Sequence, residues 1–216
     1  LHNNSIMIHG ERRIGKTSLL LQLVARLREV KDDRFWFIPL YVDLEGTTEE
    51  SFFHVLIEEI LNGVWSLPNA AEELRPNLTE LLYYKTSEVN YTDREFGRDL
   101  RDLITQLQLY GEISHPLKQL RIILLLDEMD VMSNYSRIVQ QRLRRIFMRE
   151  FAATLGAVVA GIEISKEWDR VESPWYNLFN EIHLEPFNRE QAIELLIEPV
   201  RGYYEYDQAA LERILE

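Results

Sequence analysis

The residues with the clearest chemical potential lie near the start of the chain, in the segment Gly10–Thr17, which reads GERRIGKT. This segment fits the pattern G-x-x-x-x-G-K-[ST] at every fixed position. In such a loop the glycines let the backbone curl so that N–H groups point at an anion, while the lysine reaches the β- and γ-phosphates and the threonine hydroxyl binds Mg²⁺. The predicted phosphate-binding residues are Gly10, Arg13, Ile14, Gly15, Lys16, Thr17 and Ser18.

A second candidate site is the acidic pair Asp127-Glu128, which follows the apolar run 122–126. Such a run is typical of a central strand, and open α/β sheets bind ligands at the carboxyl ends of their strands. There Asp127 is expected to hold Mg²⁺, directly or through water, opposite Thr17, and Glu128 to polarise the attacking water. The alternative is that the pair only ends a strand, but an intact phosphate loop favours chemistry. Lys16, Asp127 and Glu128 are therefore the predicted catalytic residues.

The phosphate loop needs a strand before it and a helix after it, and the sequence supplies both. Residues 5–9 read as a short buried strand, and apolar residues recur at helical spacing from Lys16 onward. Later in the chain, strands are expected at 35–42, 119–126, 155–162 and 181–184. Helices are expected at 51–61, at 93–107 with Asp93 as its cap, at 137–153, at 189–197, and after a cap at Asp207, with an insertion at 70–90. Strands that alternate with helices predict a mostly parallel sheet with helices on both faces.

Other charged residues near these elements have competing interpretations. Asp43 either contacts the water or metal ligands of the site or makes a structural hydrogen bond, and we favour the hydrogen bond. Asp130 either takes part in the chemistry or caps the next turn. His9 is expected to be a packed or hydrogen-bonded histidine, since the five histidines show no metal-ligand spacing. Arginines on the helix after the acidic pair form an arginine finger or, as we favour, a solvated face. They are Arg142, Arg144, Arg145 and Arg149, with Arg170 as a further candidate.

The composition limits the class of protein. The chain has 216 residues, 46% of them hydrophobic, which suits one large domain, or one domain plus part of another, with a real core. It contains no cysteine, which excludes a disulfide framework or a cysteine zinc site. Its 24 Lys+Arg against 36 Asp+Glu give a net charge of −12, which argues against binding to nucleic acids or acidic membranes.

The chain also lacks the signals of membrane insertion and export. No run of about 18 apolar residues occurs, so a membrane-spanning helix is excluded, and the first residues lack the order of a signal peptide. We expect a cytoplasmic protein. Because the chain begins with Leu1 just before a strand and ends at Glu216 inside a helical pattern, we also expect it to be a piece of a longer protein.

Taken together, the motifs resemble those of the additional-strand class of P-loop NTPases, which keep a Glu beside the Asp of the second motif. Residues 10–20, GERRIGKTSLL, look like the Walker A motif of bacterial and archaeal AAA+-like and STAND ATPases, and Asp127-Glu128 looks like their Walker B motif. Residues 41–46 resemble the second strand of that family, 180–192 its fifth strand and first lid helix, and 197–207 the next lid segment. The resemblance touches nearly the whole chain.

The resemblance implies an α/β three-layer sandwich around a mostly parallel five-stranded sheet of order 5-1-4-3-2. It implies that residues 1–186 form the P-loop NTPase core and that 187–216 begin a helical lid. It also implies ATP and Mg²⁺ as ligands and further domains in the same protein, and it leaves a homo-oligomer open. Many relatives carry a polar or basic sensor at the tip of the fourth strand, where this chain has Gly161-Ile162-Glu163. An acid there cannot stabilise a γ-phosphate, so we expect slow hydrolysis.

The sequence therefore predicts an ATPase that couples binding and hydrolysis of Mg-ATP to a conformational change. The absence of a guanine-reading [NT]-K-x-D signature favours adenine. One alternative is a slow or inactive nucleotide-dependent signalling switch or scaffold. Another is a DNA-associated ATPase whose DNA contacts lie outside this sequence.

Overall fold

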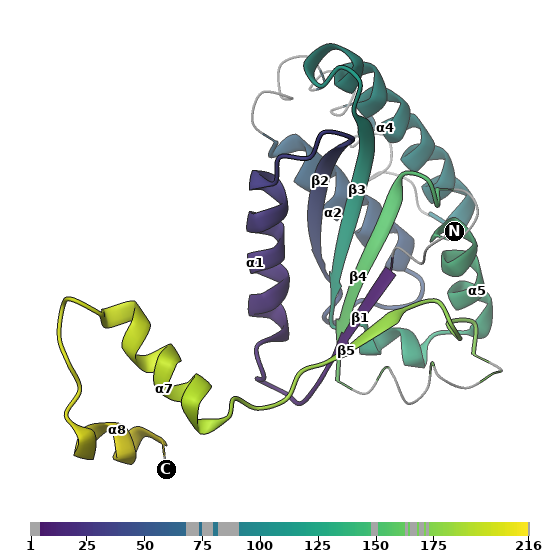
Figure 1. The fold of residues 1–216 in the computed structure, drawn as a ribbon. Coiled ribbons are helices and arrows are strands. Elements are labelled where there is room, and N and C mark those ends of the chain that lie inside the picture. The colour runs from purple at the N-terminus through teal and green to yellow at the C-terminus, as the bar shows by residue number, and fades with distance from the viewer. Residues whose placement is uncertain are drawn as a thin grey trace. The chain divides into compact units, whose positions relative to one another are not determined.

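The centre of the fold is a five-stranded sheet in which every strand runs parallel to its neighbours (Figure 1). The strands are β1 (Ser5–His9), β2 (Phe35–Asp43), β3 (Gln119–Asp127), β4 (Leu155–Gly161) and β5 (Asn180–His183). Their order is β2-β3-β4-β1-β5, which confirms the predicted order read from the other edge.

The computed structural model describes residues 5–67, 74, 80–81, 91–147, 151–162, 164, 168, 171 and 173–215.

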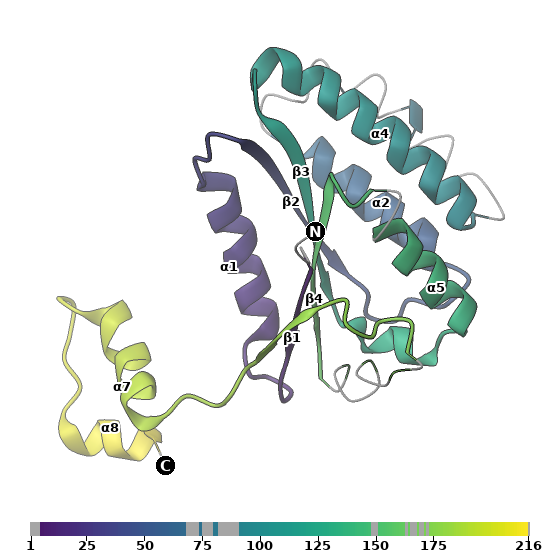
Figure 2. The ribbon, with the colours of Figure 1, turned by 45° about the vertical axis from the view of Figure 1, so that its right-hand side comes forward.

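Helices cover both faces of this sheet, which confirms the three-layer α/β architecture. Helix α1 (Lys16–Glu29) lies on one face. The opposite face carries α2 (Phe52–Trp65), α4 (Asp93–Ser114) and α5 (Arg137–Arg145), as Figure 2 shows. The described helices include none that is long and apolar enough to cross a membrane.

Strand β3 lies inside the sheet between β2 and β4, and its second half is buried on both faces. Leu124, Leu125 and Leu126 are fully buried, which is the pattern of a parallel strand between two helical layers. Earlier in the strand, Arg121 and Ile123 are half-buried, so two-sided burial is limited to the end that leads into Asp127. The packing thus fixes the strand most firmly where it delivers the acidic pair.

Several helix boundaries differ from the sequence prediction, since α2 ends at Trp65 and α4 at Ser114, beyond the expected ends at 61 and 107. The cap of α4 is Thr92 and not Asp93, because the Thr92 hydroxyl accepts the N–H of Arg94 at 3.3 Å and the Thr92 N–H donates to Glu95 at 2.9 Å. Helix α5 does not continue to residue 153, since residues 151–154 form a bend and turn in which Phe151 N–H donates to Ile146. Most of the predicted insertion at 70–90 lies outside the described residues.

The chain forms two compact units, Leu1–His183 and Leu184–Glu216. The second unit contains α7 (Arg189–Ile197), the 3-10 turn η3 (Glu198–Val200) and α8 (Gln208–Leu215). Its helices begin where the sequence predicts, because Asn188 accepts the N–H of Gln191 at 2.9 Å and Asp207 accepts that of Ala210 at 2.8 Å. None of these helices has a buried residue. The role of this unit as a nucleotide lid stays a prediction.

Candidate functional site

The phosphate loop connects the end of β1 at His9 directly to the start of α1 at Lys16. Two of its residues have a left-handed backbone, Arg13 with φ 64° and Gly15 with φ 103°. A side chain at position 15 would have room, but the backbone conformation there strains any residue other than glycine. The second glycine of the motif is therefore required by the turn itself.

The N-terminal end of α1 faces this loop. The first turn of α1 contains no acidic side chain, so the partial positive charge of the helix end is not offset by a residue of its own. Lys16 is buried, and its Nζ donates to the carbonyl oxygens of Gly10 at 2.9 Å and Glu11 at 2.8 Å. The ammonium thus lies inside the curl of the loop. Its predicted contact with the β- and γ-phosphates stays a prediction.

Asp127 lies across the loop from the start of α1, at the end of β3. Its side chain is buried, and its Oδ2 accepts hydrogen bonds from Thr17 Oγ1 at 2.6 Å and from Tyr41 OH at 3.1 Å. The other oxygen, Oδ1, accepts the backbone N–H of Glu128 at 2.9 Å. The structure therefore joins the two predicted motifs, which are 110 residues apart, through one hydroxyl–carboxylate contact.

Glu128 follows with a left-handed backbone, φ 52°, which is uncommon for a residue with a side chain. Burial raises the pKa of its carboxyl, and the neighbouring charges of Asp127 and Asp130 raise it further. A carboxylate with a raised pKa accepts a proton more readily than an ordinary glutamate does. The position and environment of Glu128 therefore suit a general base.

These elements enclose a cavity of about 210 Å³, here called the phosphate-loop pocket. Its positively charged lining contrasts with the net charge of −12 of the whole chain, so a small anion is attracted locally. Of the predicted site residues, Gly10, Ile14 and Asp127 do not line this pocket, although Asp127 is bonded to Thr17. The pocket is lined by Arg12, Arg13, Gly15, Lys16, Thr17, Ser18, Glu128 and Ile162.

The tip of β4 is fastened to the segment that carries the acidic pair. Both carboxylate oxygens of Asp130 accept the N–H of Ile162, at 3.0 and 2.8 Å. A methyl group on Gly161 would lie 2.8 Å from Asp130 Oδ2 and 2.9 Å from the side chain of Ile164, so only glycine fits there. Asp130 therefore holds Ile162 at the pocket wall, and it is not among the residues that line the pocket. Glu163, the predicted sensor position, lies outside the described residues.

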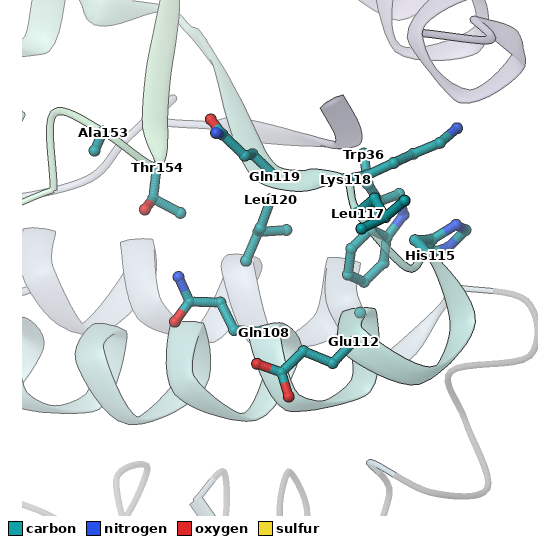
Figure 3. Close-up of a pocket in the computed structure, with 11 residues that line it drawn as sticks. Trp36, Gln108, Glu112, His115, Leu117, Lys118, Gln119, Leu120, Ala153 and Thr154 are labelled. Atoms are coloured by element: carbon teal, nitrogen blue, oxygen red, sulfur yellow. The ribbon is translucent and has the colours of Figure 1, made fainter. Parts of the chain in front are cut away.

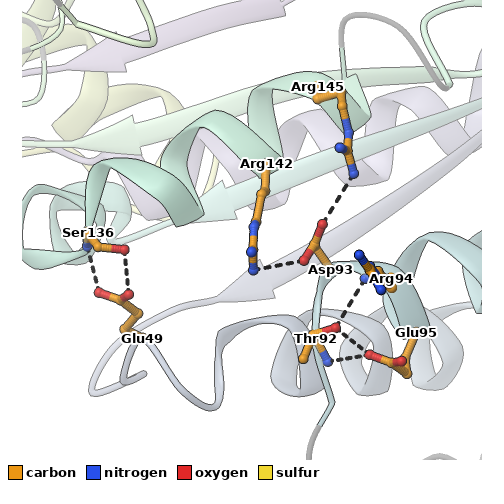
Figure 4. A network of polar contacts seen from close by, with 8 residues as sticks. All are labelled: Glu49, Thr92, Asp93, Arg94, Glu95, Ser136, Arg142 and Arg145. Atoms are coloured by element: carbon orange, nitrogen blue, oxygen red, sulfur yellow. Dashed lines mark hydrogen bonds and ion pairs between the residues drawn. The ribbon is translucent and has the colours of Figure 1, made fainter.

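Two of the arginine-finger candidates are already paired within the chain. Arg142 Nη1 lies 2.9 Å from Asp93 Oδ1, and Arg145 Nη2 lies 3.2 Å from Asp93 Oδ2, as Figure 4 shows. The same view shows Ser136, at the start of α5, donating to the carboxylate of Glu49. These pairs tie α5 to α4 and to the loop after β2. Arg149 and Arg170 lie outside the described residues.

We expect the Asp93→Asn variant to be less stable than the wild type by about 1–2 kcal/mol, because a buried acceptor loses its charge while the half-exposed arginines regain water. The midpoint of thermal unfolding then falls by roughly 2–8 °C. The matched control is Asp102→Asn, an exposed aspartate on the same helix, which should change stability by no more than about 0.5 kcal/mol. Equal melting temperatures for the two variants would show that the pairs contribute nothing.

The remaining polar candidates have structural contacts. Asp43 Oδ1 accepts the N–H of Glu45 at 2.9 Å, which is the favoured structural hydrogen bond. His9 Nδ1 lies 3.2 Å from His183 Nδ1, and His9 Nε2 lies 3.5 Å from the carboxylate of Glu181. The histidine before the loop is thus hydrogen-bonded, as expected.

The predicted site residues did not include Tyr41, which contacts Asp127, or Arg12, which lines the pocket. A signal for Tyr41 was present, because a phenol near the end of the strand next to β3 can reach the same sheet edge. The family resemblance pointed to the tip of β4, where Ile162 lies, but it did not predict the bond from Ile162 to Asp130.

A larger hollow, of about 460 Å³, lies at the opposite edge of the sheet, where β2 and β3 begin (Figure 3). On one side of it Trp36 stacks on His115, with ring centroids 4.5 Å apart. Gln108, Glu112 and Lys118 also line it. None of the predicted site residues lies there, so size alone does not identify the chemical site.

The donors around Thr17 and Asp127 suit a hard cation such as Mg²⁺, which prefers oxygen ligands and keeps several waters or phosphates. The described residues hold no group of three or more His, Asp or Glu side chains placed to bind a metal ion by themselves. A cation at Thr17 and Asp127 would therefore complete its coordination with water or with the oxygen atoms of a bound ligand, such as a phosphate.

Comparison with known proteins identifies the fold. No family model matches the chain, and no curated protein matches it. A Walker-type ATPase of Pyrococcus abyssi matches with a TM-score of 0.62 and 19% identity, over 99% of this chain and 58% of that one. Cdc6p from Pyrobaculum aerophilum matches with a TM-score of 0.59 and 16% identity, over 97% of this chain and 47% of that one. The Aeropyrum pernix Orc1 protein, in a complex with DNA, matches with a TM-score of 0.52 and 16% identity, over 89% of this chain and 42% of that one. The chain spans less than two thirds of each of these proteins.

Proposed function

From the premise that the chain has the fold of the P-loop ATPases, we propose that it binds ATP with Mg²⁺ in the phosphate-loop pocket and hydrolyses it. The observation that carries this proposal is the contact of Thr17 with Asp127 at 2.6 Å, with Lys16 and Glu128 lining the same pocket. An anion-binding loop, two oxygen donors for a cation and a candidate base are thereby brought together.

Each residue has a separate role in this proposal. The Lys16 ammonium leaves the carbonyl oxygens of Gly10 and Glu11 and binds the β- and γ-phosphates, which the N–H groups at the start of α1 also bind. Thr17 and Asp127 hold Mg²⁺, which when bound offsets the negative charge of the phosphates. Glu128 accepts a proton from the attacking water, and its raised pKa favours that transfer.

We further propose that hydrolysis is coupled to a change of conformation, in the manner of AAA+ or STAND ATPases. The structural feature that supports this coupling is the Asp130–Ile162 bond, which joins the segment after the acidic pair to the tip of β4. The second unit, Leu184–Glu216, is proposed to act as a nucleotide lid, and further domains or copies of the chain to complete the assembly.

A slow signalling switch is the second candidate, and one observation favours it. Among the described residues of the β4 tip, only Ile162 lines the pocket, and its side chain cannot stabilise charge on a γ-phosphate.

A DNA-associated ATPase is the third candidate, since Orc1 of Aeropyrum pernix is seen with DNA. The charge of −12 opposes DNA contacts by this part of the protein.

A thermal shift tests the proposal directly. At ATP and Mg²⁺ concentrations of about 100 times Kd, binding should stabilise the folded state by ~2.7 kcal/mol. For a domain of this size the melting midpoint then rises by roughly 5–10 °C. GTP at the same concentration serves as the comparison, and a smaller rise is expected with it. Absence of a shift with every nucleoside triphosphate would end the proposal.

A further inference from the structure

Asp127 Oδ2 accepts two hydroxyl donors, and the proposed function uses only one of them. The first donor is the Thr17 hydroxyl, whose oxygen is the proposed metal ligand. When it binds a cation, it would no longer donate to Asp127 as it does in the free protein. The Tyr41 hydroxyl is the second donor, at 3.1 Å, and none of the roles assigned so far involves it. When Thr17 binds a cation, Tyr41 is the hydroxyl that still donates to Asp127 Oδ2.

The sheet determines where the Tyr41 hydroxyl lies. Tyr41 pairs with Leu125 in the β2–β3 register, so its side chain is on the same face as Asp127, two residues further along β3. A tyrosine is long enough to span this diagonal between neighbouring strands. The ring has few rotatable bonds, and it is half-buried, so the hydroxyl is presented with little loss of freedom.

The chemistry of the hydroxyl matches this position. A tyrosine hydroxyl, whose ordinary pKa is about 10, is protonated at neutral pH. It therefore acts as a donor to the carboxylate, with 3.1 Å between Tyr41 OH and Asp127 Oδ2. Donation to Oδ2 orients the carboxylate and leaves its other lone pairs available for a water or a cation.

We propose that Tyr41 is a positioning residue for the Mg²⁺ site, holding the Asp127 carboxylate in its binding orientation after the Thr17 hydroxyl has moved to the cation. Such outer partners orient the groups that bind a metal and tune its affinity. This inference rests on the proposed function, because it assumes that Thr17 and Asp127 hold Mg²⁺. It adds a residue to the site that the phosphate-loop and acidic motifs do not include.

The test compares Tyr41→Phe with Tyr135→Phe. Both changes remove only a hydroxyl, and the Tyr135 hydroxyl donates to Thr47 O at 2.6 Å, away from Asp127. Each of the two phenol hydroxyls donates to one protein oxygen, Tyr41 to Asp127 Oδ2 and Tyr135 to Thr47 O. Binding of a fluorescent ATP analogue to the 216-residue chain is measured against Mg²⁺ concentration and again in EDTA.

Tyr41→Phe should raise the Mg²⁺ concentration for half-maximal binding by roughly 10-fold, while affinity in EDTA stays within about twofold of the wild type. Tyr135→Phe should leave both quantities unchanged. Equal Mg²⁺ dependence of Tyr41→Phe and the wild type would refute the inference and leave the proposed function standing. Loss of folding by Tyr41→Phe, seen by circular dichroism, would also refute it, because the hydroxyl would then act on stability. No binding by the wild type would refute the proposed function itself.

Discussion

Replacing Lys16 with alanine is expected to weaken the binding of ATP by about 10- to 150-fold. The ammonium is the one cationic group of the phosphate-loop pocket that is buried, and its bonds to phosphate oxygens would be charge-assisted. Loss of one such bond costs about 1.5–3 kcal/mol, and each 1.4 kcal/mol is about a tenfold change in affinity. Titration of a fluorescent ATP analogue in the presence of Mg²⁺ measures the change.

The matched control for this variant is Lys31→Ala, which removes the same charge from an exposed position after α1. It should leave the affinity within about twofold, because an exposed charge beyond the Debye length of about 10 Å is screened. The melting temperature of Lys16→Ala without nucleotide must also be measured, since the ammonium bonds to Gly10 and Glu11 in the free protein. Nucleotide affinity that survives in a folded Lys16→Ala protein contradicts the proposed site.

Glu128→Gln is expected to slow ATP hydrolysis by roughly 10²- to 10⁴-fold while ATP still binds. The amide keeps the size and hydrogen-bonding shape of the side chain but cannot accept a proton from water. It also removes a negative charge that faces the anion in the phosphate-loop pocket, so nucleotide affinity should stay the same or increase. Phosphate release under saturating ATP measures turnover, and the binding titration measures affinity.

Glu45→Gln is the control for this change, because Glu45 lies in the loop after β2 and its charge is close enough to raise the Glu128 pKa. It is exposed and does not line the pocket, so its turnover should remain near that of the wild type. Similar losses in the two variants would point to general electrostatics and not to a base. Undetectable turnover in the wild type, with binding intact, would favour the signalling switch.

The order of elements was predictable because the sequence carries strong local signals. An apolar strand, a glycine-containing loop and an amphipathic helix follow one another over residues 5–29, and the apolar run before Asp127 places the acidic pair at a strand end. Because parallel strands align their carboxyl ends at one edge, the meeting of the two motifs followed from the fold. The strand order itself came from the family resemblance and not from the spacing of residues.

The contacts that complete the site depend on register and on loop geometry, which a single sequence does not contain. The bond from Tyr41 to Asp127 requires β2 and β3 to be aligned at Asp43 and Asp127. The choice of Thr92 over Asp93 as a helix cap was equally hidden, because both residue types cap helices well. Asp93 is instead held by two arginines from α5, a tertiary contact that local propensity cannot anticipate.

The bond between Asp130 and Ile162 has a mechanical consequence. It joins the segment after β3 to the tip of β4. The two segments pack so closely at Gly161 that a Cβ there would lie 2.8 Å from Asp130 Oδ2. These two walls of the pocket therefore behave as a single rigid frame. We therefore expect a hinge that responds to the arrival or loss of a terminal phosphate to lie in the phosphate loop, where Arg13 and Gly15 have left-handed backbones and a Cβ at Gly15 would meet no atom within 4 Å.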